Sequence, residues 1–187
     1  MKTKLKPLFA ACLLPITPLL SQTTPGTILW VHEVGSSVIS SPAVAQDGTV
    51  FVGTSSGLIA VTNTGSSASN LWTFPLANSA AIGPDGTIYS GGNGLYAISP
   101  SGSQEWAYGV GTGAGVPAIG FDGTVYFQSA EFLYALAASG TFKWKSPLTF
   151  PGVYSAPVIG TDGTVYIASS YEANLYAFNP DGAQRWV

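Results

Sequence analysis

The sequence predicts an all-β protein of the β-propeller class, built from four-stranded antiparallel blades. Three observations predict it: a tandem repeat of about 39 residues, an Asp-Gly-Thr turn in each copy and a tryptophan in register with each copy. The 156 residues from Trp30 to Trp186 span four periods of the repeat. The turns begin at Asp47, Asp85, Asp122 and Asp162, and the tryptophans are Trp30, Trp72, Trp106, Trp144 and Trp186.

Each repeat has the pattern of four short strands. An Asp-Gly turn between two apolar segments is a strong hairpin signal, and Val165 and Ile167 alternate with Tyr166 in the two-residue period of a strand. The later Asn-Pro-Asp-Gly sequence has the residues of a tight turn. No segment after the first 26 residues combines helical periodicity with caps, so no helix is expected. In the last repeat the expected strands are 156–159, 164–168, 175–178 and 184–187.

The strands are predicted to form four complete blades with one surplus strand in front. A single blade cannot bury both of its faces, so neighbouring blades must cover them. The tryptophan in each outermost strand is therefore expected to pack across to an adjoining blade. The surplus strand surrounds Trp30, and the whole is predicted to be a partial propeller. The expected ranges are 27–33 for the surplus strand and about 41–74, 79–108, 115–146 and 155–187 for the blades.

Residues 1–24 have the features of a secretory signal peptide. Lys2, Lys4 and Lys6 precede an apolar stretch, which is the order of segments in such signals. The stretch of about 13 residues is too short to span a bilayer as a helix. Cys12 follows too short an apolar run for a lipid anchor. We therefore expect a secreted or periplasmic protein with no lipid and no membrane span.

Charge and cysteine content exclude several classes of function. Without the signal peptide, three basic and nine acidic residues remain, which is a net charge of −6. No basic patch is left to neutralise phosphates, so nucleic acid is not an expected partner. The same part of the chain contains no cysteine, which excludes disulfides and thiolate metal sites there.

A second motif carries a resemblance to a known family. The pattern Ala-x-x-x-x-Gly-x-x-x-Trp occurs at 97–106, 135–144 and 177–186, and at 60–72 with three extra residues in the turn. It resembles the repeat of pyrroloquinoline-quinone-type (PQQ-like) β-propellers, with their tryptophan-docking motif, and the resemblance covers residues 27–187. This superfamily includes calcium- and quinone-dependent dehydrogenases, the propeller lipoprotein of the outer-membrane assembly machinery, and secreted proteins with no known activity.

The number of repeats departs from that family. Its propellers usually close with about eight blades, whereas this chain has four repeats and a surplus strand. Such a strand normally completes the last blade, yet the last repeat supplies its own outer strand at 185–187. Two explanations stay open: the chain is a fragment of a longer propeller, or two copies pair through their open blade edges.

The sequence does not support catalysis. His32 is the only histidine and has no second metal ligand beside it, and no serine has the sequence of a nucleophile elbow. The glycine-rich segment 109–115 does not lead into a helix, so it is not a phosphate-binding loop. The resemblance implies that a quinone dehydrogenase would hold calcium with Glu, Asn and Asp and would stack its cofactor on a vicinal disulfide. The chain shows no such set, so we expect no enzyme activity, no cofactor and no metal.

The loops between second and third strands are the predicted binding face, because in propellers they share a face with the connections between blades. The predicted function is a non-catalytic scaffold for a protein or another ligand. The alternatives are a fragment of a quinone-dependent dehydrogenase, or a carbohydrate- or polymer-binding propeller that uses exposed aromatic residues. The candidate binding residues are Glu131, Tyr154, Tyr171, Glu172 and Asn174.

Overall fold

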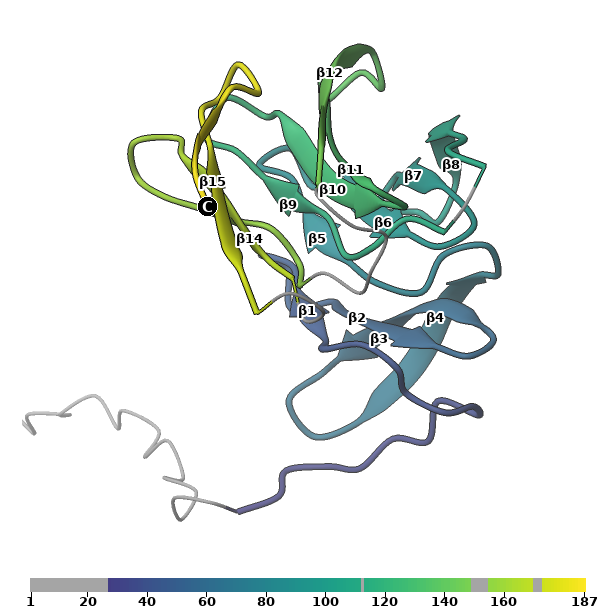
Figure 1. The fold of residues 1–187 in the computed structure, drawn as a ribbon. Helices are drawn as coiled ribbons and strands as arrows, with labels where there is room; N and C mark the ends of the chain where they lie inside the picture. Colours follow the sequence, from purple (N-terminus) through teal and green to yellow (C-terminus); the bar gives the residue numbers. More distant parts are fainter. Residues whose placement is uncertain (1–26, 112, 149–154, 170–172) are drawn as a thin grey trace, which may run out of the picture.

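The computed structural model describes residues 27–111, 113–148, 155–169 and 173–187. These residues form four sheets, each of four antiparallel strands in sequence order, and no helix (Figure 1). The prediction of an all-β chain of four-stranded blades is therefore confirmed. Across these ranges no helix exists that is long and apolar enough to cross a membrane. The predicted signal peptide, residues 1–24, lies outside the described residues.

The first two sheets follow the first two copies of the repeat. In each, the Asp-Gly-Thr turn joins the innermost strand to the second strand. The first sheet consists of β1 (Ala43–Val44), β2 (Val50–Thr54), β3 (Gly57–Asn63) and β4 (Ala68–Phe74), and the second of β5 (Ala81–Ile82), β6 (Ile88–Gly91), β7 (Leu95–Ile98) and β8 (Gln104–Tyr108).

The last two sheets repeat the arrangement. In the fourth sheet the strands start and end within two residues of the predicted bounds. The third sheet consists of β9 (Ala118–Ile119), β10 (Val125–Ser129), β11 (Phe132–Leu136) and β12 (Phe142–Pro147), and the fourth of β13 (Val158–Ile159), β14 (Val165–Ala168), β15 (Leu175–Phe178) and β16 (Gln184–Trp186).

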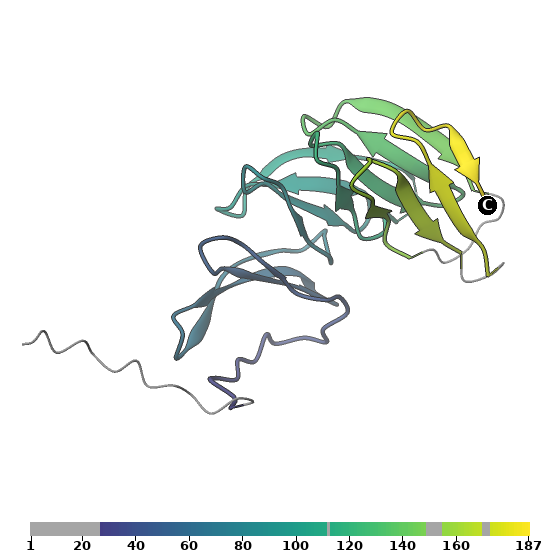
Figure 2. The same cartoon turned by 90° about the vertical axis from the view of Figure 1, so that its left-hand side faces the viewer.

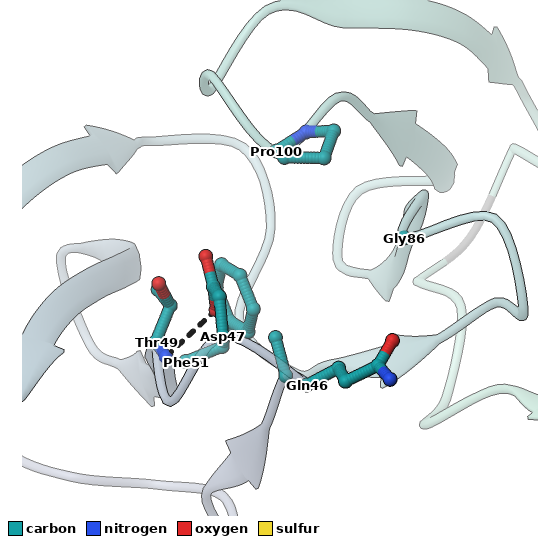
Figure 3. A pocket seen from close by; sticks show the side chains of 7 residues that line it. Gln46, Asp47, Thr49, Phe51, Gly86 and Pro100 are labelled. Atoms are coloured by element: carbon teal, nitrogen blue, oxygen red, sulfur yellow. Dashed lines mark hydrogen bonds between the residues drawn. The ribbon is translucent and has the colours of Figure 1, made fainter.

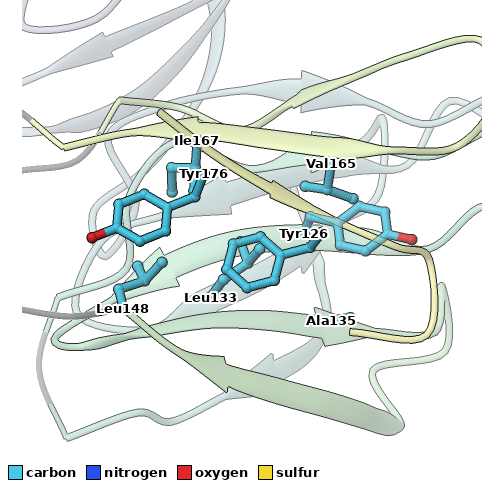
Figure 4. Close-up of a cluster of buried hydrophobic side chains, with 8 residues drawn as sticks. Tyr126, Leu133, Ala135, Leu148, Val165, Ile167 and Tyr176 are labelled. Carbon is cyan, nitrogen blue, oxygen red and sulfur yellow. The ribbon is translucent and has the colours of Figure 1, made fainter. Parts of the chain in front are cut away.

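The sheets follow one another around a common centre, with the innermost strands β1, β5, β9 and β13 side by side in that order (Figure 1 and Figure 2). One hydrophobic cluster joins each consecutive pair of sheets. Between the third and fourth sheets, Val165 and Ile167 pack on Leu133 and Tyr126, as Figure 4 shows. Alternate residues of a strand point to opposite faces, so each interior sheet contributes to two clusters.

In the first three sheets, a tryptophan on the outermost strand ties that strand to the next sheet. The indole Nε1 of Trp72 donates to the carbonyl of Pro100 at 3.0 Å, that of Trp106 to Ala138 at 2.9 Å, and that of Trp144 to Pro180 at 2.8 Å. All three rings are half-buried. They span consecutive sheets, so the expected packing of these tryptophans across to an adjoining blade is confirmed.

The predicted surplus strand at residues 27–33 is not formed, because these residues join no sheet. They contact the first sheet through side chains: Trp30 Nε1 donates to Asn63 Oδ1 at 3.2 Å, and His32 Nε2 lies 2.8 Å from Asn70 Oδ1. A strand needs a partner with free backbone groups. As the outer strand of a blade, the segment would pair with the third strand of a sheet. The third strand of every described sheet is already paired on both edges, with the second and fourth strands. The segment instead lies over part of the first sheet, where Trp30 and His32 line a hollow together with Val52.

The tryptophan contacts generate a prediction at a glycine. Gly140 has a φ of +82°, and a Cβ there would lie 2.8 Å from the Trp106 ring. Gly65 has a φ of +84° with open space around it, so it is a matched control. We expect Gly65→Ala to cost about 1–2 kcal/mol of unfolding free energy from backbone strain alone. Gly140→Ala should cost about 1–3 kcal/mol more from the clash, as measured by urea denaturation.

Equal losses for the two variants would contradict the role assigned to the Trp106 contact.

Candidate binding face

The two ends of every sheet differ in what they expose. Antiparallel pairing places the Asp-Gly-Thr turns at one end and the turns between second and third strands at the other. The blade connections bond to the latter turns: Asn78 N donates to Gly91 O at 2.9 Å, and Leu148 N donates to Glu131 O at 2.7 Å. These turns and connections therefore share one face, which we call the connection face.

Polar groups line a small hollow of about 170 Å³ on the connection face, between the first and second sheets. Thr54 and Ser55 line it from the first sheet, Asn78 from the connection, and Asn93 from the second sheet. Thr54 Oγ1 donates to Gly57 O at 2.8 Å, so this hydroxyl fixes the turn beside the hollow. The hollow offers amide and hydroxyl groups and no charged side chain.

Two of the predicted binding residues lie on this face. Glu131 is exposed in the tight turn between β10 and β11, where Ala130 has a φ of 48°. Asn174 is half-buried just before β15, and its carbonyl accepts from Ser169 N at 2.9 Å. Within the described ranges, no hydrogen bond or ion pair joins Glu131 to Asn174. The other three candidates, Tyr154, Tyr171 and Glu172, lie outside the described residues.

The aspartates of the Asp-Gly-Thr turns act as hydrogen-bond acceptors within their own turns. In each, a carboxylate oxygen accepts the backbone N–H of the threonine two residues later, at 2.9 to 3.1 Å. Asp122 and Asp162 also accept the hydroxyl of that threonine, at 2.7 and 2.8 Å. This confirms the interpretation of these aspartates as turn residues.

Hydrogen bonding lowers the pKa of three of these carboxyls below the ordinary 3.8. For Asp47 and Asp162 the main cause is the backbone N–H of Thr49 and Thr164 respectively. For Asp122 it is the hydroxyl of Thr124, with a smaller contribution from Lys143. Groups that are more acidic than usual are ionised at neutral pH, so they are poor general acids.

A groove of about 370 Å³ opens between the first two sheets at the end that carries the Asp-Gly-Thr turns (Figure 3). Phe51 and Pro100 form its apolar walls, and Gln46 and Asp47 line its edge. A similar groove of about 310 Å³ lies between the third and fourth sheets, beside Tyr126 and Pro180. The grooves recur with the repeat, which indicates that they follow from the stacking of blades.

The described residues do not fit the calcium and quinone site of the family's dehydrogenases. Within the described ranges no three residues among His, Cys, Asp and Glu gather closely enough to hold a metal ion. Each blade has one carboxylate from an Asp-Gly-Thr turn. His32 forms a hydrogen bond with the side chain of Asn70.

Comparison with known proteins decides the family. Residues 91–187 match the model of a family described as the outer membrane protein assembly factor BamB, a PQQ-like repeat family. The chain belongs to this family. No curated protein sequence matches the chain.

Several solved structures share the fold of this BamB-family chain. BamB from Moraxella catarrhalis is 22% identical with a TM-score of 0.67, over 87% of this chain and 53% of that one. A catalytically inactive virginiamycin B lyase from Staphylococcus aureus, solved with quinupristin, is 15% identical with a TM-score of 0.68, over 82% and 56%. A protein of unknown function from Bacteroides caccae is 15% identical with a TM-score of 0.62, over 84% and 62%. The chain thus spans 53% to 62% of the length of these proteins.

At these identities the likeness shows the fold, and the neighbours differ in function: one is an assembly factor by its family description and another a lyase by its name. The connection-face residues Asn78 and Asn93 were not predicted from the sequence. Their signal is weak, since asparagine is common in turns and only stacking of the sheets brings the two into one hollow.

The lowered pKa values predict the response of this BamB-family chain to acid. A carboxyl with a lowered folded pKa contributes stability above its unfolded pKa, and this is lost as the pH falls through the folded value. We expect the melting temperature to drop below about pH 4. In the variant Asp122→Asn with Asp162→Asn, one acceptor oxygen is kept for the backbone N–H of the threonine and the titration is removed, so the melting temperature should depend less on pH. An unchanged dependence would contradict the assignment.

Proposed function

We propose that this chain acts outside the cytoplasm as a non-catalytic β-propeller scaffold that binds another protein on its connection face. The observation that carries the proposal is that the described aspartates accept hydrogen bonds within turns. The aspartates of the Asp-Gly-Thr turns are ionised turn acceptors in separate blades, and Asp181 accepts Ala183 N at 3.0 Å in a further turn. Such groups build the fold and are not arranged to exchange protons with a substrate.

The family supports a scaffold. Its description as an assembly factor for outer membrane proteins favours a role in contact with other proteins. The predicted signal peptide at 1–24 supports a location in the periplasm or outside the cell. On the connection face, backbone turns, asparagines and a serine supply adaptable hydrogen-bonding groups, as such residues do in antibody binding loops.

The alternatives are less well supported. A fragment of a quinone-dependent dehydrogenase would need the ligand set that the described residues do not form. A lyase has support only from a shared fold at 15% identity, and fold alone does not specify function.

Site-specific photo-crosslinking tests the scaffold. A photoreactive amino acid at Glu131 would sit on the connection face, and one at Gln46 would sit at the opposite end of the molecule; both positions are exposed. In cells that express the full chain, we expect one reproducible protein adduct from position 131 and none of that mass from position 46. The same adducts from both positions, or none from either, would contradict a protein-binding connection face.

We propose in addition that the polypeptide of residues 27–187 associates with a second copy through the outer face of its fourth sheet. Leu58, Leu95 and Leu133 are fully buried under the next sheet, whereas the equivalent Leu175 is 48% exposed. Trp186 is 46% exposed and packs on Tyr166 in the same way as the other tryptophans pack on their sheets. These residues form an apolar face on an open sheet, which favours pairing with another chain.

Light scattering coupled to gel filtration tests the association. We expect residues 27–187 to elute as a dimer or larger species, and Trp186→Ala with Leu175→Ser to shift the population toward monomer. A control substitution at the exposed Leu71, on β4 of the first sheet, should leave the distribution unchanged. A wild-type chain that is monomeric at all concentrations would refute the association.

A further inference from the structure

An aromatic groove of about 290 Å³ lies between the outermost strands of the second and third sheets. Tyr108 lines it from β8, Tyr134 from β11, and Phe142 and Lys145 from β12. It is separate from the connection-face hollow and from the grooves beside the Asp-Gly-Thr turns.

The groove is built where the third repeat departs from the other three. Three positions of the third repeat hold Phe132, Phe142 and Lys145. The other repeats have small or polar residues at these positions, except that Val187 is the counterpart of Lys145 in the fourth repeat. The four copies of the repeat are otherwise similar. Three differences that cluster in one place therefore point to a specific feature of the third repeat. The counterparts of Phe132 are Gly57, Gly94 and Asn174; those of Phe142 are Asn70, Gln104 and Gln184; those of Lys145 are Thr73, Ala107 and Val187.

The aromatic rings in the groove are ordered by contact with one another. The rings of Tyr108 and Phe142 are nearly parallel, with an interplanar angle of 10° and centroids 6.5 Å apart. Tyr108 also meets Tyr134 edge-on at 6.3 Å. Phe142 is 46% exposed, so a large apolar surface faces solvent at this point. The second sheet supplies one wall and the third sheet the other, and the groove therefore depends on how the two sheets stack.

Lys145 places a positive charge at the aromatic rings. Its Nζ lies 4.2 Å from the centroid of Phe132 and 5.9 Å from that of Tyr134, which are cation–π distances. In the described part of the chain, the ion pairs are Lys143 with Asp122 and Arg185 with Asp162. Lys145 is thus a cation held by rings and not neutralised by a described carboxylate, in a chain that is acidic overall.

We propose that this groove binds an acidic sugar, a uronic acid unit of a polysaccharide. A pyranose ring has apolar C–H faces that pack on aromatic rings, and hydroxyls that exchange hydrogen bonds with phenol groups such as those of Tyr108 and Tyr134. Its carboxylate would pair with Lys145 in a charge-assisted hydrogen bond. The volume suits one sugar ring, and the groove is open to solvent at Phe142, so a polymer can continue beyond it. This inference goes beyond the proposed scaffold and does not rest on it.

Calorimetric titration of the full chain with trigalacturonate and with neutral galactotriose tests the site. We expect the acidic trisaccharide to bind at least about tenfold more tightly than the neutral one, because only the acid pairs with Lys145. The preference should weaken with added salt, because ions screen exposed charges.

Variants copied from the neighbouring repeats separate the contributions. Lys145→Ala, as in the second repeat, should remove the preference for the acid, and Phe142→Gln, as in the second and fourth repeats, should weaken both ligands alike. Lys143→Ala removes the same charge from the same strand, but this lysine pairs with Asp122, so acid binding should be kept. Because Ala at 145 and Gln at 142 already occur at equivalent positions of other repeats, thermal melts close to wild type are expected for these two variants.

Three results would overturn the proposal. The first is no saturable binding of trigalacturonate at concentrations up to about 10 mM. The second is an acid preference that survives Lys145→Ala in a folded variant. The third is binding of a simple aromatic carboxylate such as phenylpropionate, without binding of the sugar, which would show that the groove recognises an aromatic ring.

Discussion

Each interior sheet of this protein is apolar on both faces, so each depends on a neighbouring sheet to remove those faces from water. In the second sheet, every residue of β6 and β7 is buried, and its side chains serve two clusters. Burial of apolar surface is the dominant favourable contribution to folding. The tryptophan contacts act at the rim of the same junctions, where Trp106 crosses from the second sheet to the third.

The same constraint separates structure from function along each strand. Positions that face the centre or a neighbouring sheet hold residues that pack. The aspartates of the Asp-Gly-Thr turns accept hydrogen bonds within their own turns. Chemistry can vary only where the repeat does not need a particular residue, which is in the turns of the connection face and on the outermost strands. Glu131 lies in such a turn, and Phe142 and Lys145 lie on such a strand.

The first sheet shows how a face is covered when no sheet precedes it among the described residues. Residues 27–42 pass over Val50 and Val52, and Val38 forms a bridge with Thr54 as Ala77 does with Gly92 and Ala114 with Ser129. The segment therefore repeats part of a blade connection without forming a strand. The fourth sheet has no such cover among the described residues, which is why Leu175 and Trp186 remain accessible.

Most of the fold could be predicted from the sequence because its signals are local. An Asp-Gly-Thr turn forms its hydrogen bonds within three residues, as Asp162 and Thr164 do. A strand such as Val165–Ala168 is indicated by the alternation of its residues between the two faces. The fate of residues 27–33 could not be predicted, because a strand exists only if another chain segment has free backbone groups to pair with it. Nor could the aromatic groove, since Tyr108 and Phe142 become neighbours only when the second sheet stacks on the third. The sequence by itself determined the repeat, the turns and the class of fold. Only the tertiary structure decided which side chains of different blades meet, because those contacts depend on how whole sheets pack.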